Sequence, residues 1–383
     1  MTQESTNRVP ELDGVRGLAI LMVMSFHIFP LAITLTKNTF LNLLTQSVSM
    51  GWMGVDIFFV LSGFLITTIL LNTRNGPHYF KNFYARRILR IFPLYFLIIG
   101  GIFLLLPVLS PNMASIEQAS WPYFMLYLQN WLVIPSLKLG SYSPFVGPSW
   151  SLAIEEQFYL VWPSLVLFLS RRKLVFFSIA IVILSLAVRL ILVQFAHDWK
   201  YLQHFLYYGS FTRFDGFSVG ALIAIGFQSE QWKGILSRVA WPVLIITLAG
   251  MIAIVIGNSN VSPLEKNYYL NTWGYSLIAL ASGALVLVVT TGSKHTILPS
   301  FFRNSILVFF GKYSYAMYLI HLPIAIIVFD HTEHFHRDSI KAWLIFVSLV
   351  FALIILGSLL TWHLLEKQML KLKKYFEYQS VEA

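Results

Sequence analysis

The chain contains no cysteine, and only 11% of its 383 residues are charged. The missing cysteines exclude disulfides, thiolate metal sites and a cysteine nucleophile. The scarcity of charge argues against an ordinary soluble domain, in which about 25% of residues are charged. Apolar residues are abundant instead: 57% of the chain is hydrophobic, in long uninterrupted runs. We therefore expect an all-α polytopic membrane protein.

Ten apolar segments have the length that crosses a bilayer, about 17 to 25 residues. They are predicted over residues 12–35, 50–71, 88–108, 149–169, 174–195, 211–228, 239–257, 271–291, 305–329 and 341–363. An eleventh segment, 121–133, is shorter and contains proline, glutamine, asparagine and two tryptophans. Because that mixture is typical of a membrane interface, we expect a short interfacial or re-entrant segment there.

Basic residues favour this count over eleven spans. With the N-terminus inside and ten spans, seventeen of the 27 lysines and arginines lie in cytoplasmic segments and six in outer ones. The positive-inside rule then predicts that both termini are cytoplasmic. It also accounts for the net charge of +10 without nucleic acid. We expect one integral membrane domain over 1–383, with a basic cytoplasmic tail over 366–383, no fused soluble domain, and a bacterial inner membrane as its location.

Arg16 and His27 are the most informative pair in the first span. They are eleven residues apart, which is about three whole helical turns, so both side chains share one helix face roughly 16 Å apart along the axis. Since charged side chains are costly in hydrocarbon, both should face the protein interior or a water-filled cavity. Asp13 precedes Arg16 by three residues, which permits either a local ion pair or a helix-end charge pair.

Arg87 and Arg90 form an R-x-x-R pattern at the start of the third span, with Arg86 beside them. Residues i and i+3 face the same way on a helix, and the arginine fork matches phosphate oxygens. The pattern is therefore interpreted as a phosphate site. Ordinary positive-inside anchoring is an equally good explanation of the spacing alone.

Glu155 lies in the fourth span, four residues before Tyr159 on the same helix face. An intramembrane acid with no basic residue near it in sequence is a candidate for function. We expect Glu155 to orient or charge-balance His27, because a carboxylate–imidazole pair is a plausible general base. The alternative is an interfacial glutamate exposed to water.

Other polar residues inside the predicted spans are further site candidates. They are Asp56, Ser62, Arg213, Asp215, Ser314, Tyr318 and His321. A structural partner for a buried arginine is as good an interpretation of Asp56 as a catalytic role. Similarly, the last three form a stripe at i, i+4 and i+7 spacing that a packed hydrogen-bonded face would also produce. No metal site is expected, because the histidines at 331, 334 and 336 lack a defined fourth ligand.

Taken together, these residues resemble the membrane acyltransferase-3 family over nearly the whole chain. The resemblance rests on the run 10–17 with R-x10-H at Arg16 and His27, the run 56–64, Arg87-x-x-Arg90, the run 150–159, Arg213-Phe214-Asp215, and Tyr313-Ser314-Tyr315 leading to His321. Each motif is weak alone, whereas the ordered set is specific.

The resemblance implies an integral membrane O-acyltransferase of about ten helices. It implies acetyl-CoA or another acyl-CoA as donor, and a hydroxyl of a carbohydrate or glycolipid such as O-antigen, exopolysaccharide or peptidoglycan as acceptor, although small lipophilic acceptors also occur. The expected partners are therefore acyl-CoA, the acceptor and membrane lipids, with a homo-oligomer left open. Arg86, Arg87, Arg90 and Arg16 would hold the donor, and His27 would act as general base or form an acyl-histidine.

Two other classes of function fit the same buried polar residues. A proton-coupled transporter or flippase also places histidine, glutamate and arginine inside the membrane, although we see no matching halves of the kind many transporters show. A sensor or scaffold would use these residues only to hold helices together. It predicts that substitutions at Arg16 and His27 lower stability without a separate chemical defect.

Overall fold

The computed structural model describes residues 9–33, 47–109, 120–132, 144–257, 262, 264–332 and 340–378. Every regular element in these ranges is a helix, which confirms the all-α prediction. The long helices are α1 (Pro10–Ile33), α3 (Gly54–Thr73), α4 (Tyr79–Leu109), α8 (Trp150–Phe168), α9 (Arg171–Phe195), α11 (Phe214–Gly226), α12 (Glu230–Gly257), α13 (Tyr275–Thr291), α15 (Ser305–Thr332) and α16 (Ile340–Thr361). The short elements are η2 (Ser49–Met53), α6 (Trp121–Met125), α7 (Gln129–Leu132), η4 (Pro144–Ser149), α10 (Leu202–Tyr208), η5 (Ser210–Thr212), η6 (Leu270–Gly274), α14 (Ile297–Phe302), η7 (Trp362–Glu366), α17 (Lys367–Lys371) and η8 (Leu372–Phe376).

Each of the ten predicted spans corresponds to a helix, but only eight helical runs in the described residues are long and apolar enough to cross a bilayer. The two exceptions are α8 and α11. Helix α11 has 13 residues, or about 20 Å, which is shorter than a hydrocarbon core of about 30 Å. Helix α8 is made more polar by two adjacent glutamates and a glutamine. The membrane class thus stands, whereas ten spans and cytoplasmic termini remain predictions.

Segment 121–133 was expected not to span, and its described part agrees. It forms two short helices, α6 and α7, of five and four residues. Three predicted boundaries were wrong, one of which is the start of α12 at Glu230, nine residues before the predicted 239. Helix α4 begins at Tyr79, nine residues before the predicted start at 88, so its arginines lie within the helix. The last span also continues without interruption through η7, α17 and η8 to Phe376.

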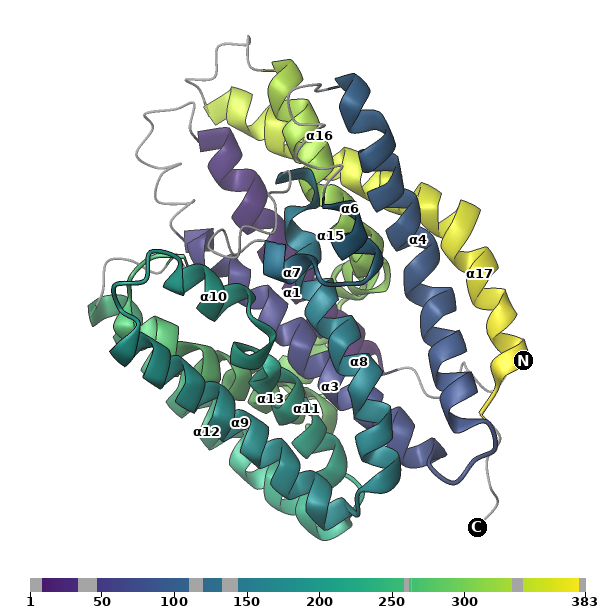
Figure 1. Ribbon diagram of the computed structural model, residues 1–383, viewed down its shortest axis with the longest axis vertical. Coiled ribbons are helices and arrows are strands. Elements are labelled where there is room, and N and C mark those ends of the chain that lie inside the picture. The colour runs from purple at the N-terminus through teal and green to yellow at the C-terminus, as the bar shows by residue number, and fades with distance from the viewer. Residues whose placement is uncertain are drawn as a thin grey trace.

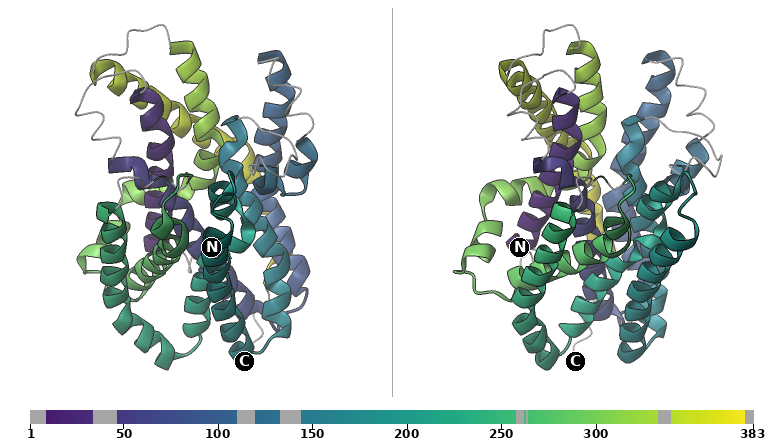
Figure 2. Two further views of the ribbon diagram at one scale, coloured as in Figure 1. Left: turned by 60° about the vertical axis from the view of Figure 1, so that its left-hand side comes forward. Right: turned by 90° about the vertical axis from the view of Figure 1, so that its left-hand side faces the viewer.

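The helices are arranged around α1, α3 and α15. In Figure 1, α9, α11, α12 and α13 lie together on one side of these three helices, while α4 and the yellow C-terminal run with α17 lie on the other. The two turned views show the upper ends of α4 and α15 extending past the group on the first side (Figure 2). The central helices therefore contact elements from both halves of the chain.

Glycines allow α1 to pack closely against its neighbours on two sides. A Cβ atom added at Gly17 would lie 2.0 Å from the carbonyl oxygen of Leu307 on α15, and one at Gly311 only 1.7 Å from that of Asp13. On the η2 side, a Cβ at Gly51 would lie 2.2 Å from the Met22 carbonyl oxygen. Small residues are the usual way for membrane helices to reach such contact. These glycines fix the register of α1 against α15, which carry Arg16, His27 and His321.

Replacing Gly17 with valine should therefore destabilise the fold by about 3 kcal/mol, since overpacking against rigid backbone leaves no side chain to move aside. Gly100 on α4 is the matched control, because nothing lies within 4 Å of its added Cβ. There, Gly100→Ala should be neutral or stabilising by up to about 1 kcal/mol. Thermal unfolding of the purified proteins in detergent measures both. Equal melting temperatures for Gly17→Val and wild type would show that α1 and α15 are not in this contact.

Candidate functional site

A cavity of about 310 Å³ lies where α1, α3, α4, α8 and α15 come together. This volume is at the lower end of the range of small-molecule sites. Its polar lining residues are Asp13, Arg16, Ser62, Arg87, Arg90, Ser151, Glu155, Tyr159, Ser314, Tyr315 and Tyr318. Most of the polar residues singled out in the sequence are therefore brought to one place, from five separate helices.

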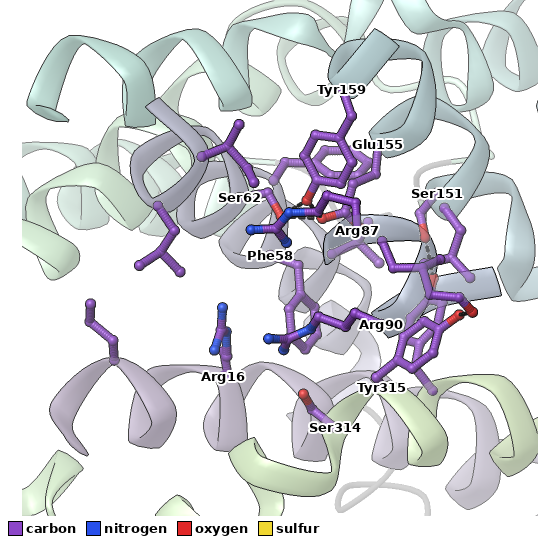
Figure 3. Close-up of a pocket in the computed structure, with 18 of the residues that line it drawn as sticks. Arg16, Phe58, Ser62, Arg87, Arg90, Ser151, Glu155, Tyr159, Ser314 and Tyr315 are labelled. Atoms are coloured by element: carbon purple, nitrogen blue, oxygen red, sulfur yellow. Dashed lines mark hydrogen bonds between the residues drawn. The ribbon is translucent and has the colours of Figure 1, made fainter. Parts of the chain in front are cut away.

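Three arginines converge on this cavity. Arg16 enters from α1, and Arg87 and Arg90 enter one turn apart from α4, with their guanidinium groups facing the same space (Figure 3). Arg16 Nη1 lies 3.4 Å from an oxygen of Asp13, which confirms the predicted local ion pair. Within the described residues, Arg90 makes neither a hydrogen bond nor a salt bridge, and its side chain is exposed. Three arginines and the carboxylates of Asp13 and Glu155 thus line the cavity, and Glu156 and Glu366 also lie close enough to interact electrostatically with Arg87 and Arg90.

Glu155 is held by two hydroxyl groups instead of by a histidine. It accepts hydrogen bonds from Ser62 Oγ and Tyr159 Oη, and these two oxygens lie 3.0 Å apart. Figure 3 shows this cluster beside Arg87, whose guanidinium carbon lies 5.5 Å from the centre of the Tyr159 ring. A single carboxylate carries one negative charge, so Glu155 balances only part of the positive charge of the three arginines that line the cavity.

The predicted contact between Glu155 and His27 is therefore wrong. The reason is the depth at which α8 begins. The helix starts at Trp150, which is buried, and the next residue, Ser151, bonds to Tyr318 on α15 with an oxygen–oxygen distance of 2.6 Å. Since α8 begins inside the protein, Glu155 lies among the arginines of the cavity.

His27 pairs instead with His321. The Nδ1 atom of His27 lies 3.2 Å from Nε2 of His321 and 3.0 Å from the carbonyl oxygen of Val23. The Nδ1 atom of His321 lies 2.7 Å from the carbonyl oxygen of Tyr318. Tyr318 lines the cavity and its ring centre is 5.8 Å from that of His321, so one residue joins the cavity to the histidine pair.

The polar stripe predicted on α15 is thereby divided. Ser314 and Tyr318 line the cavity, whereas His321, one turn further, binds His27. The Tyr318 hydroxyl donates to the carbonyl oxygen of Pro148 at 2.8 Å and accepts from Ser151. Ser151 was missed as a site residue by the sequence interpretation, although it lies in the run 150–159 and begins the helix that carries Glu155.

Asp56, Arg213 and Asp215 lie outside this cavity, in a buried ion-pair network. Arg213 Nη2 is 2.6 Å from Asp56 Oδ1, and Arg189 Nη2 is 2.8 Å from Asp215 Oδ2. The four side chains are at most 4% exposed. The first pair joins α3 to the residue that precedes α11, and the second joins α9 to α11. The Tyr275 ring of α13 lies 4.3 Å from the Arg213 guanidinium carbon. The structure thus favours the structural interpretation of Asp56, and shows Arg189 to be buried and paired.

If that network is structural, Arg213→Met should lower stability by about 3 kcal/mol or more, because it leaves a buried carboxylate unpaired. The double variant Arg213→Met with Asp56→Leu should recover most of this loss, since an apolar pair of similar volume avoids the desolvation cost. A double-mutant cycle on thermal unfolding measures the coupling. A well-folded double variant that had lost its activity would contradict the structural role and return both residues to the chemistry.

Arg86 was expected to share the phosphate site, and this is not supported by its position. Its Nη1 atom donates to the carbonyl oxygens of Lys373 at 3.4 Å and Phe376 at 3.3 Å, and its guanidinium carbon lies 4.9 Å from the Tyr378 ring centre. Adjacent residues of a helix point about 100° apart, so Arg86 faces the C-terminal run while Arg87 and, one turn later, Arg90 face the cavity. Arg86 therefore holds the C-terminal run against α4.

Comparison with known proteins decides the family. The model of the acyltransferase domain, Acyl_transf_3, matches residues 9–363. The chain belongs to the acyltransferase-3 family. The match includes every residue of the cavity and of the histidine pair, so the resemblance inferred from the motifs is confirmed. No solved structure matches the chain.

Relatives of the chain are named O-acetyltransferases. It is 30% identical over 338 residues to the peptidoglycan O-acetyltransferase OatA of Listeria monocytogenes, covering 84% of this chain and 50% of that protein. It is 26% identical over 335 residues to the O-acetyltransferase OatA of Staphylococcus aureus strain NCTC 8325, covering 85% of this chain and 52% of the other. This chain therefore spans about half the length of the relatives it matches.

Proposed function

We propose that this protein is a membrane O-acetyltransferase that moves an acetyl group from cytoplasmic acetyl-CoA, or another acyl-CoA, to a hydroxyl of a cell-surface carbohydrate. The observation that carries the proposal is the cavity on which Arg16, Arg87 and Arg90 converge, with His27 three turns along α1 from Arg16. The family and the names of the relatives support the same class of reaction.

The arginine-lined cavity is the site proposed for the phosphates of the donor. Guanidinium groups form paired hydrogen bonds with phosphate oxygens, and three of them face the same cavity. Arg87 and Arg90 bind the phosphates, and Arg16 guides the pantetheine arm toward the histidines. The offset of roughly 16 Å between Arg16 and His27 along the helix suits a long, narrow donor whose two ends are recognised separately.

His27 is the proposed general base. Its imidazole takes the proton of the acceptor hydroxyl as the oxygen attacks the thioester carbonyl carbon. The new C–O bond forms, the C–S bond breaks, and the imidazolium returns the proton to the departing thiolate of CoA. The reaction thus consumes one acyl-CoA and yields one ester and one CoA thiol, with His27 restored.

The acceptor is proposed to be a polymer or glycolipid of the cell surface, such as O-antigen, exopolysaccharide or peptidoglycan. Of these acceptors, peptidoglycan is the one that the name of the Listeria relative also contains. Acyl transfer from a cytoplasmic donor to an outer acceptor requires that the site be reached from both sides of the membrane. The proposed location of the protein is the bacterial cytoplasmic membrane.

Radiolabelled acetyl-CoA and purified protein in lipid nanodiscs test the proposal. The expected result is label in an alkali-labile ester on a glycan acceptor, together with release of an equal amount of CoA thiol. A panel of lipopolysaccharide, exopolysaccharide and peptidoglycan fragments identifies the acceptor class. Hydrolysis of acetyl-CoA without any labelled acceptor from this panel, or movement of a solute without consumption of acetyl-CoA, would contradict it.

A further inference from the structure

We propose that His321 is a positioning residue that fixes the ring of His27 and stabilises the imidazolium formed during transfer. This inference rests on the proposed function of His27 as the base. It is carried by the hydrogen-bonded chain that runs from the Tyr318 carbonyl through His321 to His27, over distances of 2.7 Å and 3.2 Å.

The two carbonyl oxygens determine which nitrogens carry protons. A carbonyl oxygen can only accept, so the Nδ1 atom of His321, 2.7 Å from the Tyr318 oxygen, must be protonated. In a neutral ring its Nε2 atom then has a free lone pair. By the same reasoning, the His27 Nδ1 atom, 3.0 Å from the Val23 oxygen, carries a proton, which it also directs at Nε2 of His321.

This arrangement leaves the Nε2 atom of His27 as the basic nitrogen. It makes no hydrogen bond within the described residues, and the His27 side chain is partly exposed while His321 is fully buried. An incoming hydroxyl can therefore donate to His27 Nε2 without displacing a protein group. When that nitrogen takes the proton, the positive charge is shared with Nδ1, whose hydrogen bond to His321 becomes charge-assisted and stronger.

His321 thus acts on His27 as the third member of a catalytic triad acts on its histidine, with a neutral ring in place of a carboxylate. Val23 shares the same N–H, but its carbonyl belongs to the preceding turn of α1 and fixes the ring only relative to its own helix. His321 belongs to α15, so it also fixes His27 relative to Tyr318 and the cavity.

Three substitutions at position 321 separate the hydrogen bond from simple packing. His321→Gln can keep an acceptor oxygen near the position of Nε2. His321→Asn can keep a donor toward the Tyr318 carbonyl but is too short to reach His27, and His321→Leu keeps only the volume. We expect kcat to fall by roughly 100- to 1000-fold for the asparagine and leucine variants, and by about tenfold or less for the glutamine variant.

The affinity for acetyl-CoA should stay within about twofold in all three variants, because the arginines of the cavity are unchanged. Equal kcat losses in the glutamine and leucine variants, with lower melting temperatures in both, would show that His321 only packs the core. A leucine variant with wild-type kcat would also overturn the proposal. A His27→Ala variant with unchanged transfer would instead refute the function proposed for His27, which distinguishes that failure from a failure of the role of His321.

A measurement without turnover tests the pair even if the substrates are wrong. In protein labelled with ¹⁵N-histidine, the hydrogen bond should give a nitrogen–nitrogen coupling between Nδ1 of His27 and Nε2 of His321. That coupling should vanish in His321→Gln, because glutamine has no imidazole nitrogen at this position. A His27 resonance with its proton on Nε2, or the absence of any coupling in folded wild-type protein, would contradict the inferred arrangement.

Discussion

Replacing His27 with alanine should lower kcat for acyl transfer by roughly 10²- to 10⁴-fold, the range that a positioned general base contributes. The affinity for acetyl-CoA should change by no more than about twofold, because His27 is outside the residues that line the arginine cavity. Steady-state kinetics with a fixed acceptor, together with calorimetric binding of CoA, measures the two quantities on the same preparation.

His331 supplies the matched control for this experiment. It is an exposed histidine near the end of α15, with its Nδ1 atom 2.8 Å from the carbonyl oxygen of Ile327 and no contact with the cavity. His331→Ala should retain wild-type kcat. A fully active His27→Ala variant would exclude both a general base and an acyl-histidine at this position. In a second experiment, wild-type protein is incubated with labelled acetyl-CoA in the absence of acceptor and then quenched with acid. Label that stays attached to the protein would favour an acyl-histidine over a general base.

Removing Arg87 and Arg90 together should weaken CoA binding by about 100-fold or more, since each hydrogen-bonded charge contributes about 1.5 to 3 kcal/mol. Lysine at either position should restore only part of the affinity, because an ammonium group lacks the bidentate fork. The Arg16→Ala variant should bind CoA less tightly and also transfer the acyl group more slowly. It loses the proposed contact with the pantetheine arm, which lies between the phosphates and the thioester of the donor. Isothermal titration with CoA measures the first effect.

Arg86 is the internal control for the arginines. It belongs to the same helix and carries the same charge, but it bonds to carbonyl oxygens of the C-terminal run. Arg86→Ala should change the affinity for CoA by no more than about threefold, because only a screened long-range charge interaction with the donor is lost. If Arg86→Ala and the Arg87/Arg90 variant weakened binding equally, the arginines would act only as membrane anchors and the cavity would not be the donor site.

Local spacing correctly predicted the features that depend on a single helix. The interval of eleven residues between Arg16 and His27 sets their shared face, and the i, i+3 relation brings Arg87 and Arg90 to one cavity. The ion pair of Asp13 with Arg16 is of the same kind. These features follow from helical geometry, which the sequence states directly.

Contacts between distant segments could not be obtained from spacing. His27 and His321 are 294 residues apart in the chain, and Asp56 and Arg213 are 157 apart. The error at Glu155 has a different origin. Sequence periodicity gives the face of a helix but not the depth at which the helix begins. Because α8 begins at a buried residue, Glu155 lies beside the arginines of the cavity and not beside His27, where it was predicted to lie.

The fold itself was predictable where hydrophobicity was continuous and less so where it was broken. Eight apolar runs gave long helices, whereas the two adjacent glutamates interrupt the apolar sequence of α8, and the short α11 is buried along most of its length. Gly220 allows α11 to pack closely against α3, because a Cβ added there would lie 2.1 Å from the carbonyl oxygen of Val60. Helix α11 is therefore stabilised by close contact with neighbouring helices.

A structure of the protein bound to a non-hydrolysable acetyl-CoA analogue, with a thioether in place of the thioester, tests the central claim most directly. We expect phosphate density in contact with Arg16, Arg87 and Arg90, and the acyl end of the analogue beside Nε2 of His27. Phosphates bound elsewhere on the protein, or an acyl end directed away from the histidine pair, would contradict it.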